Sequence, residues 1–264
     1  MAPMHNLPLS LLLAEAYKAL PIADADILYI YTDFRFFGAY ISDYKSRNDF
    51  CNAFIDPLLA MDKTVILTTF TYTSEGIFDV IKTPTRLGAM NKWILGREGV
   101  RRSEHPLFSY AAIGPQANLV EKIGKSAFGF DSIFDRLRQK RAAFLHIGRP
   151  VSLGNTVLHY VEHTCGATYR AHKAFQTEVF RGDQYIGTDY SAFLRRRDIP
   201  NESFEFDFSR AAEKLYNKGL VQQVGSDDNL SNISFYWYDP ALDYLRDLFY
   251  EDQRIFIKSD YIGY

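Results

Sequence analysis

Apolar residues near the start of the chain fall into runs whose lengths predict a strand, a helix and a second strand. Residues 27–31 and 64–70 are rich in β-branched and aromatic side chains, and such runs predict buried strands. Residues 50–61, which lie between them, have helical spacing. A helix between two apolar strands is typical of a parallel β-α-β unit. The pattern therefore predicts an α/β fold.

The remaining elements extend the same fold. Residues 142–148 predict a third short strand, and a helix over residues 155–165 follows it directly. Residues 175–190 carry more polar side chains and predict strands of a smaller, substrate-side β layer, while residues 208–219 predict another helix. No linker, repeat or low-complexity tract interrupts the chain. We therefore expect a single domain over residues 1–264, with a central mixed, largely parallel sheet flanked by helices.

The N-terminal segment and the cysteines bear on the compartment. The apolar run at residues 7–13 is shorter than a membrane span, no Lys or Arg precedes it, and it continues into an amphipathic helix that ends near Pro21. Cys51 and Cys165 lie far apart and form no CxxC pair, which favours a reducing compartment. We expect a cytoplasmic protein with no export signal and no membrane span.

The charge balance narrows the class of partner. The chain has 30 basic and 32 acidic residues and a net charge of −2, whereas nucleic-acid binders usually have a basic excess. We therefore expect a small-molecule substrate and no nucleic acid. The chain is also rich in aromatic residues, with 21 Phe and 18 Tyr, most of which we expect in the core. Aromatic side chains left at the surface would favour a homodimer.

The segment at residues 155–163 is the richest in chemistry. Thr156, His159 and Glu162 are spaced by three, so on a helix they share one face. A neutral imidazole is suited to remove a proton from an attacking amine near pH 7, and a carboxylate can fix its tautomer. The Thr156 hydroxyl, or the amides at the helix start, could face a thioester oxygen. Asn155 or Thr156 can cap the helix.

Two other interpretations of this segment remain open from the residues alone. Three polar residues at helical spacing also describe a solvated helix face. In addition, His159-x-x-Glu162-His163 matches the H-x-x-E-H pattern in which two histidines bind zinc, and Glu213 is a candidate third ligand. Features outside this helix have to decide between acyl transfer and a zinc peptidase.

A series of further motifs makes the chain similar to the aminoglycoside 3-N-acetyltransferase family, antibiotic N-acetyltransferases that are distinct from the GNAT fold. The motifs keep the family's order and spacing from about residue 60 to 225, and the main ones are R-S-E-H-P (102–106), S-Y-A-A-I-G (109–114), F-G-F-D-S (128–132), T-V-L-H-Y-V-E (156–162) and Y-R-A-H-K (169–173). A series of this kind is more specific than any one of its parts.

The resemblance implies acetyl transfer from acetyl-CoA to an amino group on a sugar, without a metal. It implies that His159 is the base, that Glu162 orients it, and that Thr156 helps at the tetrahedral oxyanion. Four residues of the first two motifs are implied to lie near the cofactor: Arg102, Ser103, His105 and Ser109.

The chain departs from the family after the first predicted strand. Family members commonly have V-H-S-S-L there, and small hydroxyl residues line the cofactor path, whereas this chain has Tyr31, Thr32, Asp33 and Phe34. We still expect Thr32, Asp33 and Phe34 to contact the cofactor. The change is compatible with a different acyl group or with another mode of CoA binding.

The acceptor is predicted from charge. Polycationic aminoglycosides favour an acidic cleft, but this chain is nearly neutral and has many aromatics that could stack on rings. We therefore expect a nucleotide-linked amino sugar of polysaccharide biosynthesis as the acceptor. The alternatives are acetylation of an aminoglycoside, which confers antibiotic resistance, and a non-catalytic relative that only binds CoA or sugar.

Overall fold

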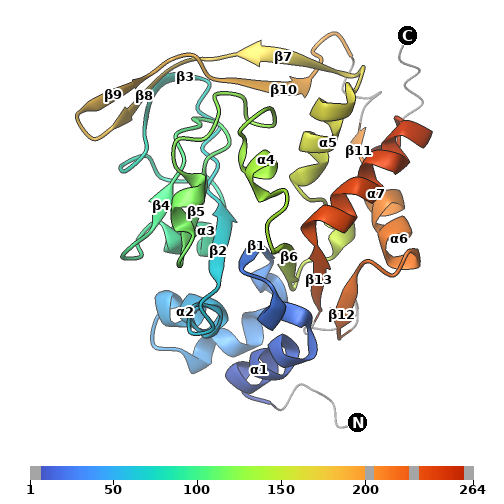
Figure 1. The fold of residues 1–264 in the computed structure, drawn as a ribbon. Helices are drawn as coiled ribbons and strands as arrows, with labels where there is room; N and C mark the ends of the chain where they lie inside the picture. The colour runs from blue at the N-terminus through green and yellow to red at the C-terminus, as the bar shows by residue number, and fades with distance from the viewer. Residues whose placement is uncertain (1–6, 200–204, 226–231, 259–264) are drawn as a thin grey trace.

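A mixed seven-stranded sheet forms the centre of the protein, in the order β12-β13-β6-β1-β2-β5-β4 (Figure 1). The computed structural model describes residues 7–199, 205–225 and 232–258. The strands of the sheet are β1 (Ile27–Thr32), β2 (Thr64–Thr68), β4 (Arg101–Arg102), β5 (Tyr110–Ile113), β6 (Ala142–Ile147), β12 (Gln222–Val224) and β13 (Ile233–Trp237). The helices are α1 (Leu9–Ala19), α2 (Arg47–Leu59), α3 (Ala89–Ile94), α4 (Ile133–Leu137), α5 (Val157–Cys165), α6 (Ser209–Asn217) and α7 (Tyr238–Glu251), and the 3-10 helices include η3 (Phe34–Asp43) and η5 (Val151–Leu153).

Parallel pairing is confined to the middle of the sheet. Strand β1 pairs in parallel with β2 and with β6, which confirms the predicted β-α-β unit. The outer pairs β12–β13, β13–β6, β2–β5 and β4–β5 are antiparallel. The sheet is mixed, as predicted, but it is less parallel than expected. Strands β5 and β13 pair antiparallel with their neighbours, and a short apolar run in the sequence does not indicate the direction of pairing.

Alternating side chains of the sheet build two cores. In β1, Leu28 and Ile30 pack toward α1, α2 and α3, while Ile27 and Tyr29 pack toward α4, α5 and α7. Successive side chains of a strand point to opposite faces, so a strand with helices on both sides is apolar throughout. This explains why the first predicted strand is a continuous apolar run.

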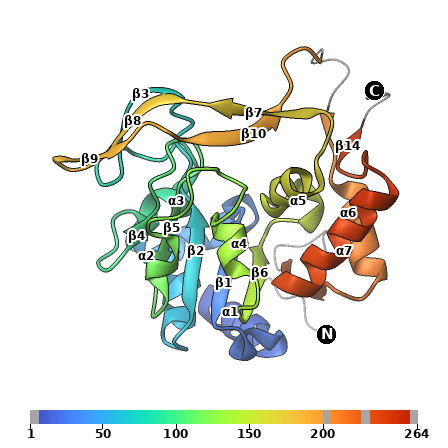
Figure 2. The same cartoon turned by 45° about the horizontal axis from the view of Figure 1, so that its top comes forward.

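A smaller β layer lies across one end of the sheet, as both views show (Figure 2). It contains β3 (Glu75–Asp79), β7 (Arg170–Ala174), β8 (Gln176–Arg181), β9 (Gln184–Gly187) and β10 (Ser191–Arg195). Strands β7 and β10 pair with each other, and β8 pairs with β3 and β9. A separate pair joins β11 (Glu205–Phe206) to β14 (Ile257–Lys258). The prediction of a second β layer is therefore confirmed.

Helix length bears on membrane insertion. Among the described residues, every helix is too short or too polar to cross a membrane.

Candidate active site

The connection between β6 and α5 brings the predicted catalytic helix to the end of β1. Gly154, which lies just before α5, has a φ of 92°, and a Cβ at this position would lie 2.4 Å from the ring of Phe208. Glycine alone adopts this backbone freely and leaves room for the ring. The tight passage places Asn155 and Thr156 beside Tyr31 of β1.

The amides at the start of α5 are already used inside the protein. The N–H of Val157 donates to Asn155 Oδ1 over 2.9 Å, and the N–H of Thr156 donates to the hydroxyl of Tyr31 over 2.9 Å. The next two amides donate to main-chain carbonyls. Asn155, and not Thr156, is therefore the capping side chain. Of the two groups predicted to face a thioester oxygen, the helix-start amides are therefore occupied inside the protein, and the Thr156 hydroxyl is the one that remains.

The second turn of α5 carries a buried polar cluster around His159 and Glu162. The Nδ1 atom of His159 lies 2.7 Å from Glu162 Oε2, as the spacing of three predicted. Tyr169 donates its hydroxyl proton to Glu162 Oε1 over 2.8 Å, and Arg170 Nε lies 2.7 Å from Oε2. The side chain of Glu162 is fully buried, whereas that of His159 is 22% exposed. The carboxylate is thus held from several sides, and the imidazole still reaches the surface.

Both pKa values in this pair are shifted downward. Burial lowers the pKa of His159, the positive charge of Arg170 lowers it further, and Glu162 acts in the opposite direction. Burial by itself raises the pKa of Glu162, but Arg170, His159 and Tyr169 together hold it below its ordinary value. At neutral pH the imidazole is therefore uncharged and the carboxylate ionised, which is the combination that a general base and its orienting group require.

The two groups beside Nδ1 of His159, Glu162 and Arg170, favour opposite tautomers of the imidazole. Glu162 accepts a proton from Nδ1, whereas Arg170, whose Nη2 lies 2.8 Å from the same atom, can only donate to it. Arg170 also donates to the carbonyl of Phe193 over 3.0 Å and forms an ion pair with Glu162. When Nδ1 carries the proton, Nε2 keeps its lone pair and can act as a base. Nε2 makes no hydrogen bond to any residue in the described part of the chain, and the rings of Phe128 and Phe206 lie beside the imidazole.

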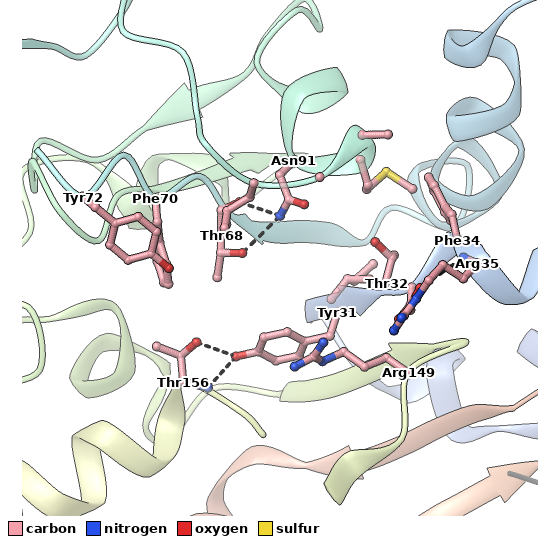
Figure 3. Close-up of a pocket in the computed structure, with 16 residues that line it drawn as sticks. Tyr31, Thr32, Phe34, Arg35, Thr68, Phe70, Tyr72, Asn91, Arg149 and Thr156 are labelled. Atoms are coloured by element: carbon pink, nitrogen blue, oxygen red, sulfur yellow. Dashed lines mark hydrogen bonds and ion pairs between the residues drawn. The ribbon is translucent and has the colours of Figure 1, made fainter. Parts of the chain in front are cut away.

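A pocket of about 470 Å³ opens at the start of α5. Figure 3 shows Tyr31, Thr156 and Arg149 on one side of it and Thr68, Phe70 and Tyr72 on the other. The remaining lining residues are Ile30, Thr32, Asp33, Phe34, Arg35, Leu87, Gly88, Ala89, Met90 and Asn91. The pocket therefore brings the predicted cofactor residues Thr32, Asp33 and Phe34 to the same cavity as Thr156.

The other four predicted cofactor residues do not line this pocket. Arg102, Ser103, His105 and Ser109 are all buried, with at most 4% of their surface exposed. Arg102 donates to the carbonyls of Val80, Thr83 and Thr69, and Ser109 donates to the carbonyl of Thr69 over 2.7 Å. Ser103 accepts the amide of Tyr110 over 2.8 Å. These polar groups hold loops together inside the fold, and their predicted place near the cofactor stays a prediction.

His105 likewise acts inside the fold. Its Nδ1 accepts the amides of Leu107 and Phe108, and its Nε2 lies 3.0 Å from the carbonyl of Ser191, to which it donates. Burial lowers the pKa of His105 to about 4. A neutral imidazole with both nitrogens satisfied links the loop before β5 to the second β layer at β10.

The geometry does not fit the zinc alternative. Glu162 is surrounded by His159, Tyr169 and Arg170, while the ring of His163 packs against His172 at 4.9 Å. Within the described ranges, no group of three or more His, Cys, Asp and Glu side chains is arranged to hold a metal ion.

Several residues of the site were not assigned a role from the sequence. Tyr169 and Arg170 belong to a motif that the family resemblance includes, and their position seven and eight residues after Glu162 gave no sign that they contact it. Tyr31 was noted only as a departure from the family, and Arg149 follows an apolar strand without any motif.

Comparison with known families agrees with the resemblance. The family model described as aminoglycoside 3-N-acetyltransferase matches residues 65–232, which is more than half of the chain. No curated protein matches the chain in sequence.

Several solved structures share the fold. Sisomicin-bound AAC-VIa has a TM-score of 0.74 and 19% identity, covering 94% of this chain and 98% of that one. Aminoglycoside acetyltransferase AAC(3)-Xa has a TM-score of 0.73 and 16% identity, with 93% of each chain covered. The YokD protein from Bacillus subtilis has a TM-score of 0.71 and 14% identity, covering 92% of this chain and 94% of that one. At these identities the likeness establishes the fold.

Proposed function

The chain belongs to the aminoglycoside 3-N-acetyltransferase family, and we propose that it transfers an acetyl group from acetyl-CoA to a primary amine of an aminoglycoside. As a member of this family it is an acyl-CoA-dependent N-acetyltransferase. The observation that carries the proposal is the contact of 2.7 Å between His159 Nδ1 and a buried, ionised Glu162, one helical turn from a pocket that Thr156 lines.

In the proposed reaction His159 serves as the general base. The amine nitrogen attacks the thioester carbonyl carbon, a C–N bond forms, and Nε2 of His159 takes the proton that the nitrogen loses. The oxyanion of the tetrahedral intermediate is stabilised by the Thr156 hydroxyl, since the helix-start amides are occupied. The C–S bond then breaks, and the thiolate of CoA takes the proton from the imidazolium. Glu162 stabilises that imidazolium.

The pocket at the start of α5 is proposed to hold the acyl donor. Its charged side chains are Arg35, Arg149 and Asp33, and Asp33 is already paired with Arg35 over 2.5 Å. Arg149 therefore leaves the lining with one positive charge for the phosphates of CoA. Thr32 and Phe34 supply a hydroxyl and an aromatic surface along the same wall. We propose that residues 1–264 act together as one acyltransferase domain.

The aminoglycoside acceptor is favoured over the nucleotide-linked amino sugar. The expectation of a nucleotide sugar and of polysaccharide biosynthesis came from overall charge, and the comparisons give it no support. The matching family model is described by an aminoglycoside substrate, and the solved structure of AAC-VIa, which shares the fold, contains sisomicin.

The experiment is release of free CoA from acetyl-CoA, followed with a thiol reagent. The acceptors are kanamycin, gentamicin and sisomicin beside UDP- and dTDP-linked amino sugars. His159→Ala removes the proposed base, and His172→Ala is the matched control on the exposed face of β7. We expect turnover with aminoglycosides that His159→Ala reduces at least ~100-fold and His172→Ala leaves within twofold. Turnover with nucleotide sugars alone, or equal rates in the two variants, would contradict the proposal.

A further inference from the structure

Tyr31 occupies the point where the pocket meets the catalytic helix. Its ring lines the pocket at the carboxyl end of β1, and its hydroxyl lies at the start of α5 (Figure 3). The phenol oxygen lies 2.8 Å from Asn155 Oδ1, 2.9 Å from the amide nitrogen of Thr156 and 3.1 Å from Thr156 Oγ1. One side chain thus contacts the capping side chain of Asn155, the amide just before α5 and a predicted catalytic hydroxyl.

The contact is supported from behind by other buried polar groups. Asn155 Nδ2 donates to the hydroxyl of Tyr236 over 2.5 Å, and the same hydroxyl lies 3.1 Å from Nε2 of His146. The ring of His146 in turn packs on that of Tyr31, with centroids 5.0 Å apart. Strands β1, β6 and β13 therefore all anchor the start of α5. A connected and buried polar network of this kind fixes one geometry.

Counting the hydrogens shows what Tyr31 leaves for Thr156. The phenol accepts the Thr156 amide and donates its single proton to Asn155 Oδ1, the nearer of its two acceptors. Because the phenol proton points to Asn155, Thr156 Oγ1 contacts the phenol oxygen through its own proton. A threonine hydroxyl proton rotates about its C–O bond, so it can turn from the phenol oxygen to a substrate oxygen while Oγ1 stays in place.

We propose that Tyr31 is a positioning residue for acyl transfer. Its hydroxyl accepts the Thr156 amide, so this amide cannot serve the thioester oxygen. The same hydroxyl holds the Thr156 hydroxyl where negative charge develops on that oxygen. Preorganised donors of this kind act in the transition state more than in the ground state, so Tyr31 affects kcat more than KM. The inference rests on the proposed function, because it acts through the role of Thr156 in that reaction.

A double-mutant cycle tests the coupling between the two residues. The variants are Tyr31→Phe, Thr156→Val and the double variant, assayed with acetyl-CoA and the best aminoglycoside acceptor. Tyr17→Phe is the matched control, because it also removes a buried hydroxyl that donates a hydrogen bond, here to the carbonyl of Phe54 in the other core.

We expect Tyr31→Phe to lower kcat about tenfold and to change the KM for acetyl-CoA less than threefold. In the Thr156→Val background the same change should lower kcat no more than twofold, because the group that Tyr31 positions is gone. Tyr17→Phe should leave kcat unchanged. Equal losses in both backgrounds, or an unchanged kcat in Tyr31→Phe, would overturn the inference.

A measurement without substrate separates this inference from the proposed function. Amide hydrogen exchange of the peptide over residues 155–160 should speed up in Tyr31→Phe and not in Tyr17→Phe, since the Thr156 amide loses its acceptor. Unchanged exchange there would contradict the inference even if the enzyme is active. Conversely, loss of turnover in Thr156→Val and His159→Ala with an unaffected Tyr31→Phe would leave the proposed function intact and reject the role of Tyr31.

Discussion

At the scale of single residues, two opposite charges, those of Glu162 and Arg170, lie beside the same ring nitrogen of His159, Nδ1. Glu162 stabilises the imidazolium and Arg170 destabilises it, while burial favours the neutral form. A base for an amine has to be neutral before the reaction and has to accept charge during it. The combination of burial, one anion and one cation provides both conditions within one buried cluster.

The charge of Arg170 can be tested by Arg170→Gln. Removing the cation beside Nδ1 favours the protonated imidazole, so the pKa of His159 rises and the rising limb of kcat/KM moves to higher pH. The measurement is the pH profile of kcat/KM between pH 5 and 9. Glu162→Gln removes the opposite charge and is expected to move the limb to lower pH. Shifts in the same direction for both variants would contradict this account.

At the scale of elements, the connection from β6 to α5 serves both the pocket and the catalytic helix. Arg149 lines the pocket and donates from Nη2 to the carbonyl of Leu153 in η5 over 2.6 Å. Five residues later, Gly154 turns the chain into α5 with a positive φ. The same short segment therefore places the positive charge of Arg149 in the pocket and fixes the direction in which α5 begins.

Arg149→Gln tests whether the pocket binds the phosphates of the donor. We expect the KM for acetyl-CoA to rise about tenfold, as for loss of a charge-assisted phosphate contact, while kcat stays within twofold. The KM for acetyl-pantetheine, which has no phosphates, should be unchanged. Arg141→Gln, outside the pocket and at the surface, serves as the control. An equal rise of KM for both donors would show that Arg149 contacts another part of the donor.

Gly154→Ala tests the geometry of the connection. The added Cβ would meet the ring of Phe208 at 2.4 Å, and alanine is disfavoured at a φ of 92°. We expect a loss of unfolding free energy of about 1–3 kcal/mol, measured by urea denaturation, together with a lower kcat from a displaced α5. Gly166→Ala, at a φ of 75° and a ψ of 48° with open space around its Cβ, measures the milder cost of a left-handed helical backbone without a clash.

How much of these elements could be predicted from the sequence depends on how local their contacts are. The shared face of Thr156, His159 and Glu162 was predicted from helical spacing, and the contact between His159 and Glu162 confirms it for these two residues. The partners of Tyr31 and Asn155 could not be predicted, because they join residues 124 and 81 positions apart through the order of strands in the sheet. The R-S-E-H-P motif suggested cofactor contact, but polar residues at such spacing serve a buried loop equally well.

At the scale of the whole molecule, the two cores contain ionisable groups that are stable only when neutral. His105 and His146 are fully buried, and burial lowers their pKa values to about 4 and about 3. In the unfolded chain both histidines titrate near pH 6.5. Between these values the unfolded state binds more protons than the folded state, so stability rises with pH and is lost on acidification.

The expected size of this effect makes it measurable. From pH 7 to pH 5, each of the two histidines should reduce the unfolding free energy by about 2 kcal/mol, which is a large part of the roughly 5–15 kcal/mol of a typical protein. Urea denaturation at half-unit pH steps measures the slope. His146→Phe keeps a ring between Tyr31 and Tyr236 and removes the titrating group, so the loss of unfolding free energy between pH 7 and pH 5 should shrink by about 2 kcal/mol even if the variant is less stable at pH 7. An unchanged slope in that variant would mean that carboxylates, and not the buried histidines, set the acid limit of the fold.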